Sequence, residues 1–94
     1  MTWTVSIPDN IELVLDRISD DDLRERILDR LEDMEGDPYQ YIKPLRGVPF
    51  FSFRVDGYRG IVSLKKRKLV VMVLRLAPRN ISYRELMELA KRRF

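Results

Sequence analysis

The chain contains neither cysteine nor histidine. Without cysteine it cannot form disulfides or a thiolate metal site. Without histidine it lacks the usual zinc ligand, the proton shuttle that works near pH 7, and the base of a Ser-His-Asp triad. Any catalysis must therefore rely on arginine, lysine, tyrosine, serine, threonine or a carboxylate.

Long apolar stretches are missing as well. No apolar run approaches the roughly 20 residues that a membrane-spanning helix needs. The first ten residues, MTWTVSIPDN, lack the basic and apolar segments of a secretion signal. We therefore expect a cytoplasmic protein with no membrane partner. A hydrophobic fraction of 45% is too high for a disordered chain, and 94 residues suit one domain spanning 1–94.

Charge is divided unevenly along the chain. Residues 1–40 hold four arginines against twelve carboxylates, a net charge of −8, whereas residues 41–94 hold fourteen cations against three carboxylates, a net charge of +11. Clustered lysine and arginine create a local positive potential that attracts polyanions. The division therefore predicts a nucleic-acid-binding surface in the second half. The alternative is that the two halves neutralise each other in the folded protein.

The first half predicts a strand followed by two helices. Alternating β-prone residues over 2–7 indicate the strand, and apolar residues at helical spacing over 8–19 indicate the first helix. A second apolar stripe continues to Gly36. Asp22 and Glu25 have the spacing of a capping box, which places the start of the second helix at Asp22. We expect the acidic outer face of this helical hairpin to remain in water.

The second half changes to a period of two. After a predicted loop over 37–49, three strands are expected at 50–55, 58–64 and 69–76, joined by an Asp-Gly turn and by the cationic turn KKRK. Ser82 and Glu85 again have capping-box spacing, so a last helix should begin near Tyr83. The predicted fold is α+β, in the order β-α-α-β-β-β-α. Its mainly antiparallel sheet carries the helical hairpin on one face, and a C-terminal helix completes the domain.

The hairpin sequence FRVDGYRG places two arginines directly opposite each other. If Asp56-Gly57 forms the turn, Arg54 faces Arg59, and like charges in this position are destabilising. Strand parity puts both arginines on the face away from the helical hairpin, which we expect to be open. Arg79, at the end of the last strand, and Tyr83 could converge there. Such a cluster suits a phosphate clamp, and the alternative is that each arginine pairs with a carboxylate.

Two segments, LRGVPFFSFRVDGYRGIVSL and VMVLRLAPRNISYRELMELAKRRF, resemble the RelE branch of the RelE/ParE toxin superfamily. The resemblance spans essentially the whole chain. Each motif is short, and it is their shared order and spacing that carries the resemblance. The matching elements are Leu45-Arg46-Gly47, Gly57-Tyr58-Arg59, Arg79 and Tyr83.

The resemblance implies the toxin of a type II toxin–antitoxin pair. Such a toxin enters the ribosome, cuts messenger RNA at the decoding site without a metal or other cofactor, and is neutralised by a RelB-like antitoxin. The 2′-hydroxyl of the RNA attacks the adjacent phosphate. Arg59 and Arg79 match family positions that hold this phosphate, and Tyr83 matches a tyrosine near the reacting groups.

One departure concerns the base. Active members often carry two lysines on the strand before the turn, where Ser52 and Arg54 stand here. Arginine effectively cannot lose its proton, so Arg54 should anchor phosphate rather than act as the base. Tyr83 is the remaining candidate, provided that neighbouring arginines lower its pKa. We therefore predict Arg54, Arg59, Arg79 and Tyr83 as the catalytic group.

Further residues are predicted to contact RNA through charge, hydrogen bonds or stacking. Tyr58 offers a ring for a base, and the cationic turn at 65–68 either attracts phosphate or keeps the sheet edge soluble. The predicted RNA-binding residues are Lys43, Arg46, Ser52, Tyr58, Lys65, Lys66 and Arg84.

Two other functions remain open at this point. A ParE-like toxin on the same scaffold would bind DNA gyrase and cut nothing, although such a toxin does not require an arginine cluster. A basic RNA-binding module without catalysis would also explain the charge.

Overall fold

The computed structural model of the protein describes residues 2–92, apart from the side chain of Tyr83. The predicted α+β fold and the order β-α-α-β-β-β-α are confirmed, with one short extra strand and a 3-10 turn in the middle of the chain. The elements are β1 (Thr4–Ser6), α1 (Asp9–Asp16), α2 (Asp21–Asp33), η1 (Pro38–Gln40), β2 (Lys43–Pro44), β3 (Phe51–Val55), β4 (Tyr58–Lys65), β5 (Val70–Pro78) and α3 (Tyr83–Arg92).

The five strands form one sheet in the order β1-β5-β4-β3-β2. β1 runs parallel to β5, and the other neighbours are antiparallel. The predicted loop over 37–49 is wrong in part, because it contains η1 and the edge strand β2. β2 has only two residues, and proline at an edge strand loses no sheet hydrogen bond. A strand this short leaves no periodic signal in the sequence.

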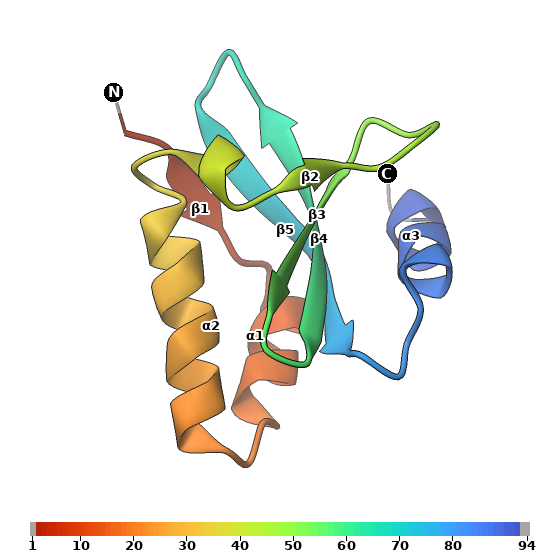
Figure 1. Cartoon of the computed structure of the whole chain (residues 1–94). Coiled ribbons are helices and arrows are strands. Elements are labelled where there is room, and N and C mark those ends of the chain that lie inside the picture. Colours follow the sequence, from red (N-terminus) through yellow and green to blue (C-terminus); the bar gives the residue numbers. More distant parts are fainter. Residues whose placement is uncertain (1, 93–94) are drawn as a thin grey trace.

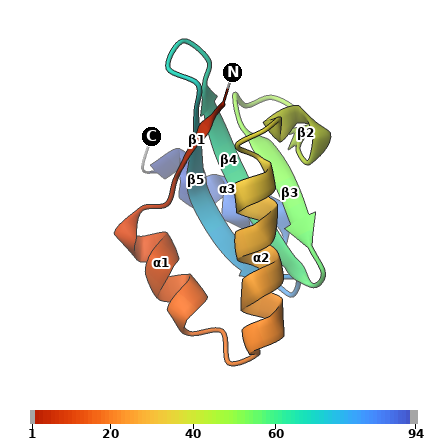
Figure 2. The ribbon, with the colours of Figure 1, turned by 90° about the vertical axis from the view of Figure 1, so that its left-hand side faces the viewer.

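The sheet lies between two helical layers (Figure 1). α1 and α2 cover one face, and α3 lies on the opposite face (Figures 1 and 2). The main core joins the helical hairpin to the sheet, and a smaller core joins α3 to it. The smaller core contains Phe50, Ile61, Leu86 and Ala90. None of the helices in the described part of the chain has the length and apolarity to cross a membrane.

The helix starts show how local hydrogen bonds set the boundaries. The Asp20 side chain accepts bonds from the backbone N–H groups of Asp22 (3.0 Å) and Leu23 (3.2 Å), so Asp20 is the N-cap of α2. The predicted cap at Asp22 is therefore wrong. Three consecutive aspartates can all cap, and Asp20 is the one with extended backbone immediately before the helix. At α3 the predicted cap is confirmed, since the Ser82 hydroxyl accepts from the Glu85 N–H at 3.2 Å.

A bulge in β5 turns two consecutive side chains toward α3. Ile61 pairs with Arg75 while Val62 pairs with Val73, which leaves Leu74 as the extra residue. Leu74 packs against the smaller core. The Arg75 guanidinium donates to the Leu89 carbonyl of α3 at 3.1 Å. The bulge thus lets adjacent residues of β5 both hold the last helix.

Candidate nucleic-acid interface

The arginine pair predicted from the hairpin is present. Arg54 of β3 pairs with Arg59 of β4, and Val55 pairs with Tyr58 across the turn. Ser52 and Arg54 alternate with Phe53 and Val55, which are buried in the main core, so both arginines lie on the α3 side of the sheet. Arg54 is exposed and Arg59 is half-buried. The turn therefore presents two cations of unequal exposure side by side.

The face that carries these arginines is only partly open. The sequence led us to expect an uncovered surface, but α3 packs over β4 and β5 through Ile61, Leu86 and Ala90. The expectation of an uncovered face is therefore wrong over these two strands. Ala77, the partner of Arg59 across β4 and β5, also packs against this smaller core. What remains accessible is the end of the sheet near the β3–β4 turn, with the β3 edge beside it.

Arg79 reaches the same end of the sheet. It follows Pro78, the last residue of β5, which pairs with Tyr58. A Cβ placed on Gly57 would lie 3.9 Å from Cδ of Arg79, so this side chain runs against the β3–β4 turn. Arg79 is exposed. Arg54, Arg59 and Arg79 therefore lie at the same end of the sheet, and their convergence on one phosphate stays a prediction.

The carboxylate in the turn is engaged on the other side. Asp56 accepts a bond from Nε of Arg26 in α2 at 2.5 Å, and this bond raises the pKa of Arg26. Asp56 has a φ of 50°, a left-handed conformation that aspartate tolerates better than most residues. Within residues 2–92, neither Arg54 nor Arg79 forms an ion pair with a carboxylate. For these two arginines, the alternative of intramolecular neutralisation is therefore not supported.

Tyr83 is the first residue of α3, and the turn before it is closed by a bond from the Ile81 N–H to the Pro78 carbonyl at 3.0 Å. Tyr83 lies four positions after Arg79 in the chain. Its side chain lies outside the part of the molecule that the structure describes. Its role as a base therefore stays a prediction.

The predicted RNA-binding residues divide between the two ends of the sheet. Lys43 of β2 pairs with Ser52, and both line a surface hollow of about 350 Å³ together with Arg54. Lys65 and Lys66 lie at the β4–β5 turn, at the opposite end of the sheet. Tyr58 packs against the main core on the face opposite Arg59, so it does not lie beside the arginine cluster, and its contact with RNA stays a prediction. Strand alternation accounts for this, because adjacent residues point to opposite faces.

Two other predicted RNA contacts remain exposed without joining the hollow. Arg46 follows β2 in the turn that ends at Gly47, where φ is 81°. Arg84 lies in the first turn of α3. Both are accessible cations on the basic half of the chain.

Sequence reasoning missed two residues near the hollow. Tyr41 lines it, and the Arg30 guanidinium of α2 lies 4.9 Å from the centre of the Tyr41 ring. Tyr41 ends the η1 turn with helical backbone (φ −118°, ψ −5°), so strand alternation does not relate its direction to that of Lys43. The spacing of the two residues therefore gave no signal for Tyr41. Arg30 gave none, since its contact depends on how α2 packs.

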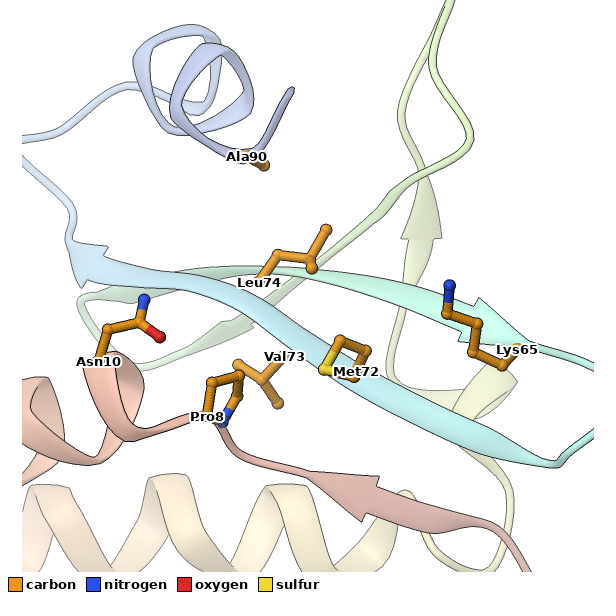
Figure 3. A pocket seen from close by; sticks show the side chains of 7 residues that line it. All are labelled: Pro8, Asn10, Lys65, Met72, Val73, Leu74 and Ala90. Carbon is orange, nitrogen blue, oxygen red and sulfur yellow. The ribbon is translucent and has the colours of Figure 1, made fainter. Parts of the chain in front are cut away.

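A second hollow, of about 260 Å³, lies between α3, β5 and the start of α1. Its lining is mostly apolar, with Leu74 and the Lys65 amine pointing toward the side of β5 on which Ala90 lies (Figure 3). Among residues 2–92, no arginine lines it. This hollow is therefore separate from the arginine cluster.

No protein-family model matches the chain, and no curated protein matches its sequence. Solved structures do match its fold. The toxin–antitoxin complex RelBE2 from Mycobacterium tuberculosis contains a chain that is 22% identical, with a TM-score of 0.75, and the match covers 84% of this chain and 100% of that one. The archaeal RelE–RelB complex from Pyrococcus horikoshii OT3 is 24% identical, with a TM-score of 0.75, over 87% of this chain and 100% of that one.

A third similar structure is the free E. coli toxin RelE, solved as a double arginine mutant. It is 21% identical to this chain, has a TM-score of 0.74, and the match covers 100% of this chain and 99% of that one. At sequence identities of 21–24%, these matches show a shared fold. The chain therefore has the RelE fold, as the sequence motifs predicted.

Proposed function

We propose that this protein is the toxin of a type II toxin–antitoxin pair, a cytoplasmic endoribonuclease that cuts messenger RNA at the decoding site of the ribosome. The RelE fold supports this proposal, and the convergence of Arg54, Arg59 and Arg79 at one end of the sheet carries it. A toxin that acts by binding gyrase does not require such a cluster. The two complexes with this fold support a RelB-like partner, whose acidic residues would mask the arginines.

The proposed reaction transfers a phosphoryl group within the RNA, from the 5′-oxygen of one nucleotide to the 2′-oxygen of the nucleotide before it. The 2′-hydroxyl oxygen attacks the adjacent phosphorus and its proton passes to a base, while the bond to the 5′-oxygen breaks and that oxygen takes a proton from solvent. The products are a 2′,3′-cyclic phosphate and a 5′-hydroxyl. Arg59 and Arg79 bind the phosphate oxygens and stabilise the charge that grows on them, while Arg54 anchors the strand. Tyr83 is the proposed base. Arg54 cannot take this role, because an arginine side chain stays protonated and cannot accept the proton of the 2′-hydroxyl.

The test is induction of the protein in cells, followed by primer extension on total RNA. Wild-type protein should produce cuts inside codons of translated messages. Arg59→Ala and Arg79→Ala should each reduce the cut fraction by about 100-fold or more, the usual effect of losing a transition-state hydrogen-bond donor. Arg17→Ala is the matched control, because Arg17 is an exposed cation at the end of α1, on the face of the sheet opposite the arginine cluster. It should cut as wild type does.

Equal cutting by all three variants would show that the assigned site is wrong. Failure of DNA supercoiling before translation would instead favour the gyrase-binding toxin. Loss of RNA affinity in the arginine variants, with no cut in any sample, would favour an RNA-binding module.

A further inference from the structure

The hollow beside Arg54 has a size and a lining that suit a small polar group. It has a volume of about 350 Å³, within the range of ligand pockets, and its lining residues are Tyr41, Lys43, Ser52, Phe53 and Arg54. Two of these are cations, and none is a carboxylate. Arg54 also belongs to the arginine cluster, so the hollow begins where the proposed phosphate site ends.

Arg30 holds the aromatic side of this hollow in place. Its guanidinium carbon lies 4.9 Å from the centre of the Tyr41 ring, a cation–π contact. One of its terminal nitrogens also donates to the Arg54 carbonyl at 3.4 Å. The same guanidinium thus links the Tyr41 ring to the strand that carries Arg54. Arg30 acts here as a positioning residue.

The edge of β3 is accessible at this place. β2 pairs only with Phe51 and Ser52, so the strand continues past its neighbour through Arg54. The N–H and C=O of one residue point to the same edge of a strand, and the Arg54 carbonyl bonds toward α2. The Arg54 N–H therefore points toward the same edge, where it can donate to an acceptor on a bound group.

We propose that this hollow binds one nucleobase of single-stranded RNA, next to the phosphate held by the arginine cluster. Tyr41 supplies the stacking surface, and Lys43 and Arg54 neutralise the phosphates on either side of the base. Aromatic stacking beside cations is the usual way in which proteins hold unpaired bases. The inference rests on the proposed function for its RNA substrate, and it adds a subsite that orients the nucleotide beside the cut.

The experiment measures binding away from the ribosome and without cleavage. The probe is a fluorescein-labelled trinucleotide with 2′-O-methyl riboses, which has no attacking hydroxyl, and a matched set in which each base in turn is removed. For wild-type protein, removal of one particular base should weaken binding by about 5- to 100-fold, the usual contribution of one stacked base. Fluorescence anisotropy reports the affinity.

Tyr41→Leu should abolish that difference, because leucine fills the space against the core but offers no aromatic face. Tyr41→Phe should retain it. Tyr39→Leu is the matched control, since Tyr39 is 50% exposed, lies two residues away and does not line the hollow. Thermal denaturation of each variant confirms folding. If Tyr41→Leu still distinguishes the intact probe from the abasic one, the subsite is wrong.

The outcomes separate this inference from the proposed function. Base-dependent binding through Tyr41 without any cleavage in cells would leave the subsite standing and overturn the nuclease. Cleavage in cells, together with RNA binding that does not depend on Tyr41, would support the nuclease and overturn the subsite. A poly-glutamate peptide is the competitor. If it displaces the probe from wild-type protein, and if Tyr41→Leu weakens binding of the peptide as much as binding of the probe, the hollow binds acidic protein segments and the RNA subsite is overturned.

Discussion

Substitution of Gly60 by alanine tests how β3 and β4, the two strands that carry Arg54 and Arg59, pack against each other. Gly60 of β4 pairs with Phe53 of β3, and the phenyl ring lies directly over it. A Cβ on Gly60 would lie 2.8 Å from Cδ1 of the ring and closer still to Cε1 and Cζ. Phe53 is 2% exposed and packs in the main core, so its ring is held in place by its neighbours. The ring must therefore leave its position, or the strands must separate.

Overpacking of a core costs about 1–3 kcal/mol. The clash at Gly60 involves three ring atoms, so we expect the upper part of this range, about 2–3 kcal/mol. In a domain of this size each kcal/mol lowers Tm by about 4–8 °C, which predicts a loss of roughly 8–24 °C. Arg54 follows Phe53 on β3, so the proposed RNA cleavage should fall as well.

Thermal denaturation followed by circular dichroism measures this loss. Gly36→Ala is the control, because the nearest atom to its added Cβ, the Asp33 carbonyl oxygen, lies at an ordinary 3.6 Å. Its free energy of unfolding should change by no more than about 0.5 kcal/mol. Combining Gly60→Ala with Phe53→Leu should cost less than the sum of the two single changes, since they share one contact. If Gly60→Ala has the same Tm as Gly36→Ala, the packing argument is refuted.

Three further predictions concern the elements around the site. Asp20→Ala should lower the free energy of unfolding by about 1 kcal/mol in urea denaturation, because it removes the cap of α2; Asp22→Ala should cost clearly less, and the reverse order would contradict the cap assignment. Arg75→Met should speed amide hydrogen exchange in α3 by about tenfold or more while α2 is unchanged, because a charged hydrogen bond to the helix is lost; uniform exchange would contradict this anchor. Asp56→Asn keeps the left-handed turn but removes the ion pair with Arg26, so its Tm loss should vanish in about 1 M salt; a loss that persists would mean that turn geometry dominates.

The parts of the fold that sequence predicted are those set by neighbours in the chain. Asp56-Gly57 is a two-residue turn between alternating strands, and a turn of that length sets the register that places Arg54 opposite Arg59. Ser82 caps α3 through a bond to a residue three positions later. In both cases the residues that decide the structure lie within a few positions of one another, so the sequence pattern contains the whole cause.

The parts that were missed depend on contacts between distant segments. The position of α3 on the arginine face follows from packing of Leu86 against Ile61 and Phe50, which no local pattern reveals. The contact between Arg30 and Tyr41 depends on how α2 meets the β2 edge. A one-residue bulge beside Ile61 was equally invisible, because alternating apolar residues look the same on either side of it.

The parallel pairing of β1 with β5 has a consequence for synthesis of the chain. Residues 4–6 find their partners only at residues 70–72, so the first strand to be made must wait for one of the last. Arg79 comes later still. A nascent chain that stops before residue 70 has neither a finished sheet nor the third guanidinium, so under the proposed function a fragment released at that point should not cleave RNA.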